Sequence, residues 1–358
     1  MKTMRSFLLT VLVAGTTACG DETVAPLDDG ATIALCDLAE SLTVQGSFPD
    51  AIPALTEPAL VGAESADYLV DSDRVLGLVV DGEARAYPHN ILWWHEIVND
   101  RFGDLWISVS YCPLTGSGLA MDATIDGRRV EFGVSGLLFA NNLVMFDRLS
   151  EDLFGPQLSA TGKCQSFANA VPDRHPVREM SWGAWKDLYP LTRVVSDDTG
   201  YSRNYRLYPY GSYDDLDNSD LLFPQVPDDT RPIKERVLGI RTGEFSGRAY
   251  PFGELAARGS TVALNQNVGG ESVAVFYSAD DGESAVAYRP TVNGQTLTFE
   301  ADGDMWRDLE TGTSWNLAGA AVDGPLAPAR LEPVAEAYVV FWFAWKHFQP
   351  DSEIWLAN

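Results

Sequence analysis

The chain has 358 residues, of which 46% are hydrophobic and 11% aromatic, so it is long and apolar enough to form two globular domains. It carries 51 acidic and 25 basic residues, which give a formal net charge of −26. Because such a surface repels phosphate backbones, the charge argues against nucleic-acid binding. The acidic residues are spread along the chain, which indicates a solvated surface and not an acidic binding tail.

The first residues, "MKTMRSFLLTVLVAGTTACG", have the pattern of a secretion signal. Two basic residues precede an apolar stretch at residues 7–13, and small residues lead up to Cys19. The end of this stretch resembles a bacterial lipoprotein box, in which the cysteine is lipidated. Ordinary cleavage with a free Cys19 is the alternative, because Thr16 stands where leucine is usual. We expect a signal peptide at 1–18 and a lipid-anchored leader at 19–46. The N-terminal lipid would attach the protein to a membrane. The expected location is the cell envelope, facing the periplasm.

Three cysteines remain after Cys19, and in an oxidising compartment two of them are expected to pair. Cys36 lies in the polar leader and Cys164 in the loop "SATGKCQSF", so these two form the expected disulfide. Cys112 is then the expected free thiol or ligand.

The body of the chain has mostly β signals. "RVLGLVV", the turn "DG" and "EARAYP" predict a hairpin over residues 74–88. Apolar residues at helical spacing predict a helix in "NILWWHEIVND", residues 90–100, and another in "SWGAWKDLY", residues 181–189. Further runs of strand length, divided by turn residues, lie at 105–111, 118–125, 128–134 and 142–148.

The sequence also contains an internal repeat. Residues 74–92, "RVLGLVVDGEARAYPHNIL", return as "RVLGIRTGEFSGRAYPFGEL" at 236–255, and further blocks match in the same order. We therefore predict two related units, at 47–200 and 230–357, joined by a linker at 201–229 that is rich in Tyr, Pro and Asp. The predicted fold is mainly β with short helices, a β-rich α+β protein of two tandem units, each of sandwich or barrel type.

The repeat serves as an internal control for function. Residues alike in both copies, such as Tyr111 and Tyr277, are assigned to the scaffold, and chemically specialised residues present in one copy mark what that copy does. Four such residues of the first copy are replaced by chemically different residues in the second. His95, Glu96, Cys112 and Met145 correspond to Thr261, Val262, Ser278 and Trp306. The first unit is thus predicted to carry the site, and the second to be a degenerate structural partner. His89, which corresponds to Phe252, is a candidate third ligand, but a surface position in a first helical turn is the expectation for it.

Three functions are compatible with these residues. A thiolate and an imidazole are good ligands for soft or borderline metals, and a thioether favours copper, so Cys112, His95 and Met145 predict a copper site for metal handling or redox chemistry. Without a metal, Cys112 is a candidate nucleophile of a thiol enzyme, with His95 as base and Glu96 as a further acid or base. In the third hypothesis the side chains are buried and inert in a structural or binding module. Whether the protein is an enzyme stays open.

Other residues are expected to line the same site. They are Tyr111 next to the cysteine, Ser135 in the glycine-rich run "FGVSGLLFANN", and Asp147 and Arg148 in "MFDR". Asp308 corresponds to Asp147 in the second copy, which favours a turn or capping role for that carboxylate.

Several motifs together resemble a known family. "RAYPHNILWWHEIVND", "VSYCPLTGS", "FGVSGLLFANNLVMFDR", "WKDLYPLTRVVS" and "PYGSYDD" are similar to those of the family catalogued as domain of unknown function 3179, secreted or lipid-anchored proteins mainly of bacteria and archaea. The resemblance spans about residues 50–350 and implies no agreed activity. Many relatives have a second cysteine in the turn, as "CPLCG", where this chain has Thr115, so a two-cysteine redox cycle within the motif is not expected. Gln157 occupies the place of a glutamine that follows "MFDR" in the family and is expected near the site.

Overall fold

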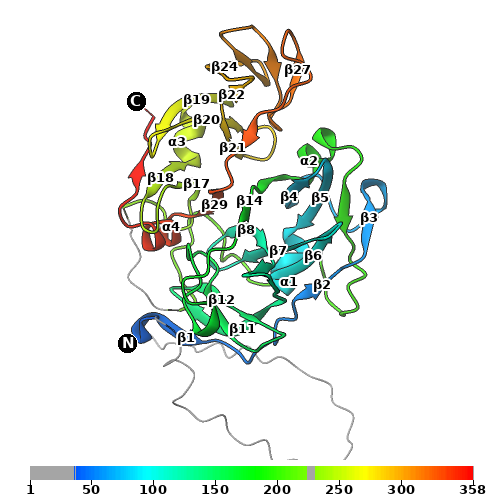
Figure 1. The fold of residues 1–358 in the computed structure, drawn as a ribbon, viewed down its shortest axis with the longest axis vertical. Helices are drawn as coiled ribbons and strands as arrows, with labels where there is room; N and C mark the ends of the chain where they lie inside the picture. The colour runs from blue at the N-terminus through cyan, green and yellow to red at the C-terminus, as the bar shows by residue number, and fades with distance from the viewer. Residues whose placement is uncertain (1–35, 37, 224–229, 358) are drawn as a thin grey trace, which may run out of the picture.

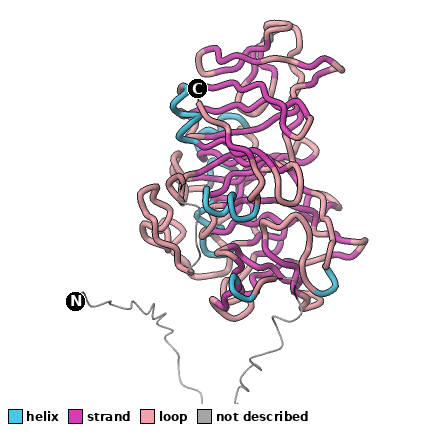
Figure 2. Tube along the Cα trace, turned by 90° about the vertical axis from the view of Figure 1, so that its left-hand side faces the viewer, coloured by secondary structure: helices cyan, strands magenta, loops and turns pink. Residues whose placement is uncertain are grey.

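The computed structural model describes residue 36 and residues 38–223 and 230–357. Strands dominate these residues, and the four α-helices are short, with seven residues each (Figures 1 and 2). This confirms the predicted β-rich fold with short helices. The predicted signal peptide and Cys19 lie outside the described residues. No helix in the described part of the chain is long and apolar enough to cross a bilayer.

Three open sheets form the larger part of the first unit. One has the strand order β15 (Arg178–Ser181), β4 (Arg74–Val80), β5 (Glu83–Pro88), β16 (Arg193–Val195) and β3 (Leu60–Gly62). The second has the order β14 (Arg174–His175), β8 (Ser117–Asp122), β7 (Leu105–Cys112), β6 (Ile97–Phe102) and β2 (Leu55–Thr56). The third has the order β1 (Thr43–Gln45), β11 (Phe132–Phe139), β12 (Asn142–Asp147) and β13 (Leu153–Pro156). The hairpin β9 (Thr124–Ile125) and β10 (Arg128–Arg129) and the helices α1 (His89–His95) and α2 (Trp182–Leu188) complete the unit.

The second unit repeats this arrangement. Its first sheet has the order β29 (Ala337–Phe341), β17 (Arg236–Arg241), β18 (Gly247–Pro251) and β30 (Glu353–Ile354). Its second has the order β19 (Thr261–Val268), β20 (Glu271–Ser278), β21 (Ser284–Arg289) and β28 (Glu332–Pro333). Its third has the order β24 (Phe299–Asp302), β25 (Met305–Asp308), β26 (Ser314–Trp315) and β27 (Ala321–Asp323). The hairpin β22 (Thr291–Val292) and β23 (Gln295–Thr296) and the helices α3 (Phe252–Arg258) and α4 (Trp342–Phe348) accompany them. A sandwich or a barrel was predicted for each unit; the described residues form no closed barrel.

Equivalent residues of the two copies make the same contacts. Asn99 donates from Nδ2 to the carbonyl of Phe132 at 2.8 Å and accepts from its N–H at 2.9 Å. Asn265 makes the same two bonds to Phe299, both at 2.8 Å. The amide therefore ties the same two strands together in each unit. The exact bounds of the units stay a prediction.

The predicted helix over residues 90–100 is only half formed. It ends at His95, and Glu96 has a positive φ of 55°, after which Ile97 begins β6. A left-handed residue cannot continue an α-helix, and the β-branched Ile97 and Val98 suit the strand that follows. The apolar residues at helical spacing in 90–100 therefore belong to two elements, a helix that ends at His95 and a strand that begins at Ile97.

The two units lie against each other and share apolar cores. In Figure 1 the strands of the second unit, in yellow and orange, lie above those of the first, in cyan and green. One buried cluster joins Trp185 of the first unit to Phe276 of the second, and another joins Phe132 to Trp342. The backbone N–H of Phe341 also donates to the carbonyl of Thr115 at 2.9 Å. The units are thus held together by buried apolar surface and by backbone hydrogen bonds.

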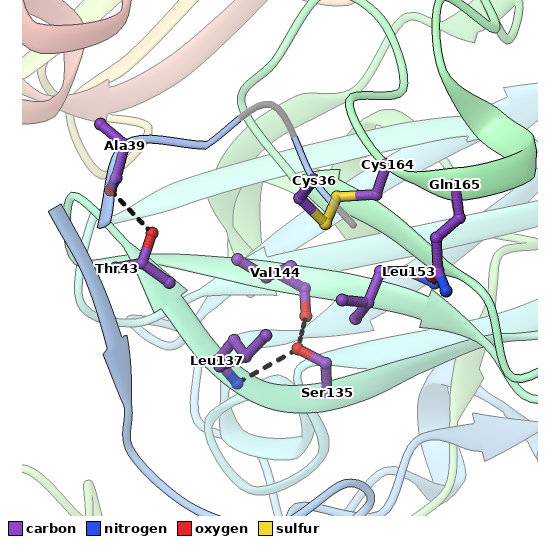
Figure 3. Close-up of a disulfide and its surroundings, with 9 residues drawn as sticks. All are labelled: Cys36, Ala39, Thr43, Ser135, Leu137, Val144, Leu153, Cys164 and Gln165. Carbon is purple, nitrogen blue, oxygen red and sulfur yellow. Dashed lines mark hydrogen bonds between the residues drawn. A yellow bond between two sulfur atoms is a disulfide. The ribbon is translucent and has the colours of Figure 1, made fainter. Parts of the chain in front are cut away.

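Cys36 and Cys164 form a disulfide, the pairing predicted from the sequence. It ties the N-terminal segment to the loop after β13, close to the β11–β12 pair (Figure 3). Cys112 is the free cysteine of the described residues.

Candidate functional site

Cys112 ends β7, and its side chain is fully buried. The sulfur donates to the carbonyl of Asn141 at 3.6 Å. Burial, and then the charge of Glu96, raise the pKa of the thiol to about 11. The side chain is therefore a protonated thiol at neutral pH, and it has neither the low pKa nor the exposure of a reactive cysteine.

A buried polar network holds the turn that follows Cys112. Gln157 Oε1 accepts from Ser117 Oγ at 2.8 Å and from Asn142 Nδ2 at 3.0 Å, and Asn142 Nδ2 also donates to Thr115 Oγ1 at 3.1 Å. Gln157 Nε2 donates to Ser110 Oγ at 3.0 Å. Gln157 thus lies beneath the turn, where it fixes the backbone and has no free group for a ligand. Thr115, at the position of the second cysteine of relatives, belongs to this network.

His95 has other partners. Its Nδ1 lies 2.7 Å from the carbonyl of Pro53 and its Nε2 lies 2.7 Å from the hydroxyl of Tyr205. No hydrogen bond joins His95 to Cys112 within the described residues. The registers give the reason: in the second unit Thr261 pairs with Ser278, the positions that correspond to His95 and Cys112, whereas the first unit's ladder stops at Ile97 and Ser110. The turn at Glu96 removes His95 from the strand that would have placed it opposite the cysteine.

Glu96 is the charged neighbour of Cys112. Its side chain is 5% exposed, and burial alone raises the pKa of the carboxyl to about 8. No hydrogen bond or ion pair reaches this carboxyl group from the described residues. Its negative charge, when present, raises the pKa of Cys112 and of Tyr210. The predicted acid or base therefore lies beside the thiol, while the predicted imidazole does not.

Met145 is fully buried and belongs to the same apolar cluster as Cys112. The described residues contain no group of three or more His, Cys, Asp or Glu side chains that could hold a metal ion. Cys112 and Met145 therefore belong to one apolar cluster. His95, the third metal ligand predicted from the sequence, has other hydrogen-bond partners.

Three of the predicted lining residues have structural roles in the β11–β12 region. Ser135 donates to the carbonyl of Val144 at 2.6 Å and accepts from the N–H of Leu137 at 3.1 Å, beside a register shift (Figure 3). Asp147 caps the following turn by accepting from Ser150, as Asp308 does for Thr311 in the second unit. Arg148 pairs with Asp50 at 3.0 Å.

Tyr111, the fourth, faces a different place. Successive side chains of a strand point to opposite faces, and Tyr111 and Cys112 accordingly belong to two different apolar clusters. Tyr111 lines a cavity of about 460 Å³ between the two units. His89 lies beside its ring, with the ring centroids 4.1 Å apart, and lines the same cavity. The expectation that His89 lies at the surface was wrong, because its side chain is 3% exposed.

Eight charged residues line this cavity. Three of them, Arg74, Glu179 and Arg236, form one cluster; the others are Asp73, Asp214, Lys234, Glu235 and Glu283. Arg74 Nε donates to Glu179 Oε1 at 2.8 Å, and Arg236 Nη1 lies 3.9 Å from the same oxygen. Arg74 also donates from Nη1 to the carbonyl of Gly282, and Arg236 from Nη2 to Glu283, at 2.5 and 2.7 Å. The carboxylate of Glu179 thus lies between two guanidinium groups, one from each unit.

Four buried atoms of this cluster have no hydrogen-bond partner. They are Arg74 Nη2, His89 Nε2, Glu179 Oε2 and Arg236 Nη1. His89 Nε2 and Glu179 Oε2 lie 4.0 Å apart, too far for a direct hydrogen bond. Buried polar groups in folded proteins nearly always have partners, so this group of four makes the cavity the candidate place for a bound polar molecule.

Burial and mutual charges set the protonation of this cluster. Burial lowers the pKa of His89 to about 4, so the imidazole is neutral at pH 7. Burial opposes the ionised form of Glu179, but the positive charges of Arg74 and Arg236 lower the pKa of its carboxyl below the usual value. Burial, and then repulsion by Arg74, lower the pKa of Arg236. The cluster therefore combines a carboxylate, two guanidinium groups and a neutral imidazole.

The comparison of the two repeat copies did not identify this charged cluster, although the sequence contains its residues at informative positions. Arg74 and Arg236 begin the repeated block and are alike in both copies, which assigned them to the scaffold. Glu179 pairs with Leu76 as Val339 pairs with Leu238, so it is a charged residue present in one copy only. The rule that identified Cys112 would also have selected Glu179 had this register been known.

Comparisons with known proteins give a family and no activity. Neither a curated protein nor a solved structure matches the chain. The model of one family matches residues 49–352, which include Cys112, the charged cavity and most of both units. The chain therefore belongs to the family described as "Protein of unknown function (DUF3179)".

Proposed function

We propose that the protein binds a small oxyanion, a carboxylate or a phosphate, in the cavity between its two units. The observation that carries the proposal is the pair of buried guanidinium N–H groups without partners, Arg74 Nη2 and Arg236 Nη1. A guanidinium group has donors only, and each buried donor without an acceptor costs about 1–3 kcal/mol. An oxyanion supplies acceptors to both groups in the geometry that guanidinium groups favour.

The other cation of the cavity does not compete for such a ligand. Lys234 Nζ already donates to the carbonyl groups of Tyr213 and Asp220, at 2.6 and 2.9 Å, and lies 3.4 Å from the centre of the Tyr213 ring. The free donors are therefore those of the two arginines. Because the repeat supplies one arginine from each unit, a ligand held by both also links the units.

Thermal unfolding in the presence of anions tests the proposal. We expect acetate or inorganic phosphate, replacing chloride at constant ionic strength, to raise the Tm of the wild-type protein. An anion at a tenfold excess over its Kd should add about 1.4 kcal/mol to the free energy of unfolding. Arg236→Gln should abolish this rise because it removes one donor. Arg289→Gln is the control, since Arg289 forms a half-exposed pair with Glu271. The proposal fails if neither anion raises the Tm of the wild-type protein.

Copper binding is a second proposal, and the burial of Cys112 and Met145 in one cluster supports it. The protein would be loaded with copper, freed of excess metal and analysed for bound copper, together with Cys112→Ser and Met145→Leu. Copper in the wild-type protein that both variants lose would support this proposal. Equal copper contents in all three proteins would reject it.

The thiol-enzyme hypothesis predicts that Cys112 reacts readily with alkylating reagents, whereas its burial in the structure predicts that it does not. Because the thiol is fully buried and its pKa is about 11, we expect iodoacetamide to alkylate Cys112 only after denaturation. Mass spectrometry of native and denatured protein at pH 8 measures the difference. Rapid alkylation of the native protein, and its slowing in Glu96→Gln, would instead favour a thiol enzyme with Glu96 as the proton acceptor.

We also propose that the protein is a lipoprotein of the cell envelope. The N-terminal sequence supports this location, and so does the disulfide between Cys36 and Cys164, since such bonds persist in oxidising compartments. Labelling of cells with a radioactive fatty acid should mark the wild-type protein and not Cys19→Ser. Equal labelling of the two would contradict lipidation at Cys19.

A further inference from the structure

The four unpartnered atoms of the cavity differ in what they require. Arg74 Nη2 and Arg236 Nη1 require an acceptor. Glu179 Oε2, on an ionised carboxylate, requires a donor. The Nε2 of the neutral His89 takes either role, according to its tautomer. A simple carboxylate has no hydroxyl group, so on its own it satisfies the two arginines and leaves the glutamate and the histidine without partners.

We infer that the ligand is a small hydroxy acid, with its anionic group on Arg74 and Arg236 and its hydroxyl group between His89 Nε2 and Glu179 Oε2. This inference rests on the proposed oxyanion site. A hydroxyl oxygen about 2.8 Å from each of two atoms fits between Nε2 and Oε2, which are 4.0 Å apart. The hydroxyl group donates to the carboxylate and accepts from the imidazole, so one group satisfies both atoms.

A ligand ammonium group is the alternative donor, and the two guanidinium groups next to Glu179 disfavour it at this carboxylate. Glu179 already faces two cations, with Arg74 Nε at 2.8 Å and Arg236 Nη1 at 3.9 Å. Burial, and then repulsion by Arg74, already lower the pKa of Arg236. A third cation in contact with the same carboxylate would add to this repulsion, whereas a hydroxyl group adds no charge. At Glu179 a hydroxyl group is therefore the better donor, and because Asp73, Asp214, Glu235 and Glu283 also line the cavity, alanine is included among the test ligands.

The surroundings fix the two atoms that would hold the hydroxyl group. The imidazole of His89 lies beside the ring of Tyr111, and Arg74 Nε holds the other oxygen of Glu179. Both side chains are nearly inaccessible, with 3% and 4% of their surface exposed. The two side chains are thus held in place, and a ligand does not have to order them.

Three probes that share one carbon skeleton test the inference: lactate, propionate and alanine. Ligand-observed NMR titration of the wild-type protein should give a Kd for lactate that is roughly tenfold to a hundredfold lower than that for propionate, the usual effect of a hydrogen bond to a charged group. Alanine should bind no more tightly than propionate. Arg236→Gln should weaken the binding of lactate and propionate alike, and Arg289→Gln should change neither.

Two variants identify the residues that recognise the hydroxyl group. In Glu179→Gln the amide oxygen is expected to stay on Arg74 Nε, so the amide N–H faces the ligand and cannot accept from its hydroxyl group. Propionate should then bind more tightly, because a buried negative charge is lost, while the preference for lactate falls towards one. His89→Phe, which copies Phe252 of the second unit, should lower the preference for lactate without changing propionate binding, and it provides the test if Glu179→Gln does not fold.

The outcomes separate this inference from the proposed function. Equal binding of lactate and propionate, both lost in Arg236→Gln, would overturn the hydroxy-acid inference and leave the oxyanion site standing. A preference for lactate that neither Glu179→Gln nor His89→Phe reduces would overturn the assigned geometry, and tighter binding of alanine than of lactate would overturn the choice of a hydroxyl group. Binding of none of the three acids would overturn the inference, and the proposed function would fall with it if inorganic phosphate does not bind either.

Discussion

Glu96 and His89, at opposite ends of helix α1, are both buried and are both held in their uncharged forms. Burial raises the pKa of Glu96 to about 8 and lowers that of His89 to about 4. The two shifts affect stability in opposite directions. The uncharged glutamic acid stabilises the fold at low pH, and this contribution is lost as the pH rises from the ordinary value of 4.5 through 8. The neutral histidine stabilises the fold above the ordinary value of 6.5, and this contribution is lost as the pH falls towards 4.

Glu96→Gln should therefore stabilise the protein at alkaline pH. The amide cannot lose a proton, so the variant should equal the wild type near pH 4 and exceed it at pH 8 by an amount on the order of 3 kcal/mol. Urea unfolding at a series of pH values measures this difference. Glu300→Gln, at an exposed position of β24, is the control and should show no such trend. If Glu96→Gln and wild type have parallel pH profiles, the carboxyl group is not protonated in the folded protein.

At the scale of elements, the two helices that close the units pack in the same way. Trp185 of α2 lies over Gly77 of β4, and Trp345 of α4 lies over Gly239 of β17. Each indole N–H donates to a hydroxyl group seven residues later, Thr192 at 2.8 Å in the first unit and Ser352 at 2.9 Å in the second. The glycine leaves the space in which the tryptophan ring lies, so the strand and the helix depend on each other.

Gly77→Ala and Gly239→Ala should each destabilise the protein. The added Cβ atom would lie 2.1 Å from the ring of Trp185 or Trp345, which forces the indole or the strand to move and costs about 1–3 kcal/mol or more. Urea unfolding measures the loss. Gly46→Ala is the matched control, because its nearest neighbour would lie at 3.4 Å, an ordinary contact. Unchanged stability of both strand variants would show that the tryptophans pack elsewhere.

At the scale of the whole molecule, duplication creates a site that neither unit contains alone. Arg74 and Arg236 hold equivalent positions at the start of β4 and β17, and the packing of the units brings both to Glu179. Residues of the second unit also line the cavity, among them Phe252 and Glu283. The second unit is therefore more than a structural partner of the first if the proposed oxyanion site is correct.

The disulfide should make a large contribution to global stability. It joins residues 128 positions apart, and closing a loop of this size in the unfolded chain is worth on the order of 4–5 kcal/mol in the chain-entropy model. Dithiothreitol should therefore lower the Tm of the wild-type protein by several degrees. The double variant Cys36→Ala/Cys164→Ala should show the lower Tm with or without the reductant. A Tm that the reductant does not change in the wild-type protein would contradict this contribution.

The sequence by itself determined most of the strands, the duplicated blocks and the disulfide pair. The strands follow from local patterns, because alternation and turn residues act within a few residues of the chain. It also proposed a partnership of His95 and Cys112 from their joint absence in the second copy. The structure gives His95 other partners, since one left-handed residue, Glu96, ends the helix and changes the direction of the chain.

Only the tertiary structure decided which residues form the charged cavity. Arg74, His89, Glu179 and Arg236 are separated by up to 162 positions along the chain; the repeat relates Arg74 to Arg236, but no sequence pattern relates these two to His89 and Glu179. The packing of the two units against each other buries these groups together and removes water from them, which leaves four polar atoms without partners. Burial and the distances between charges are properties of the folded chain, and they are the properties on which the proposed oxyanion site rests.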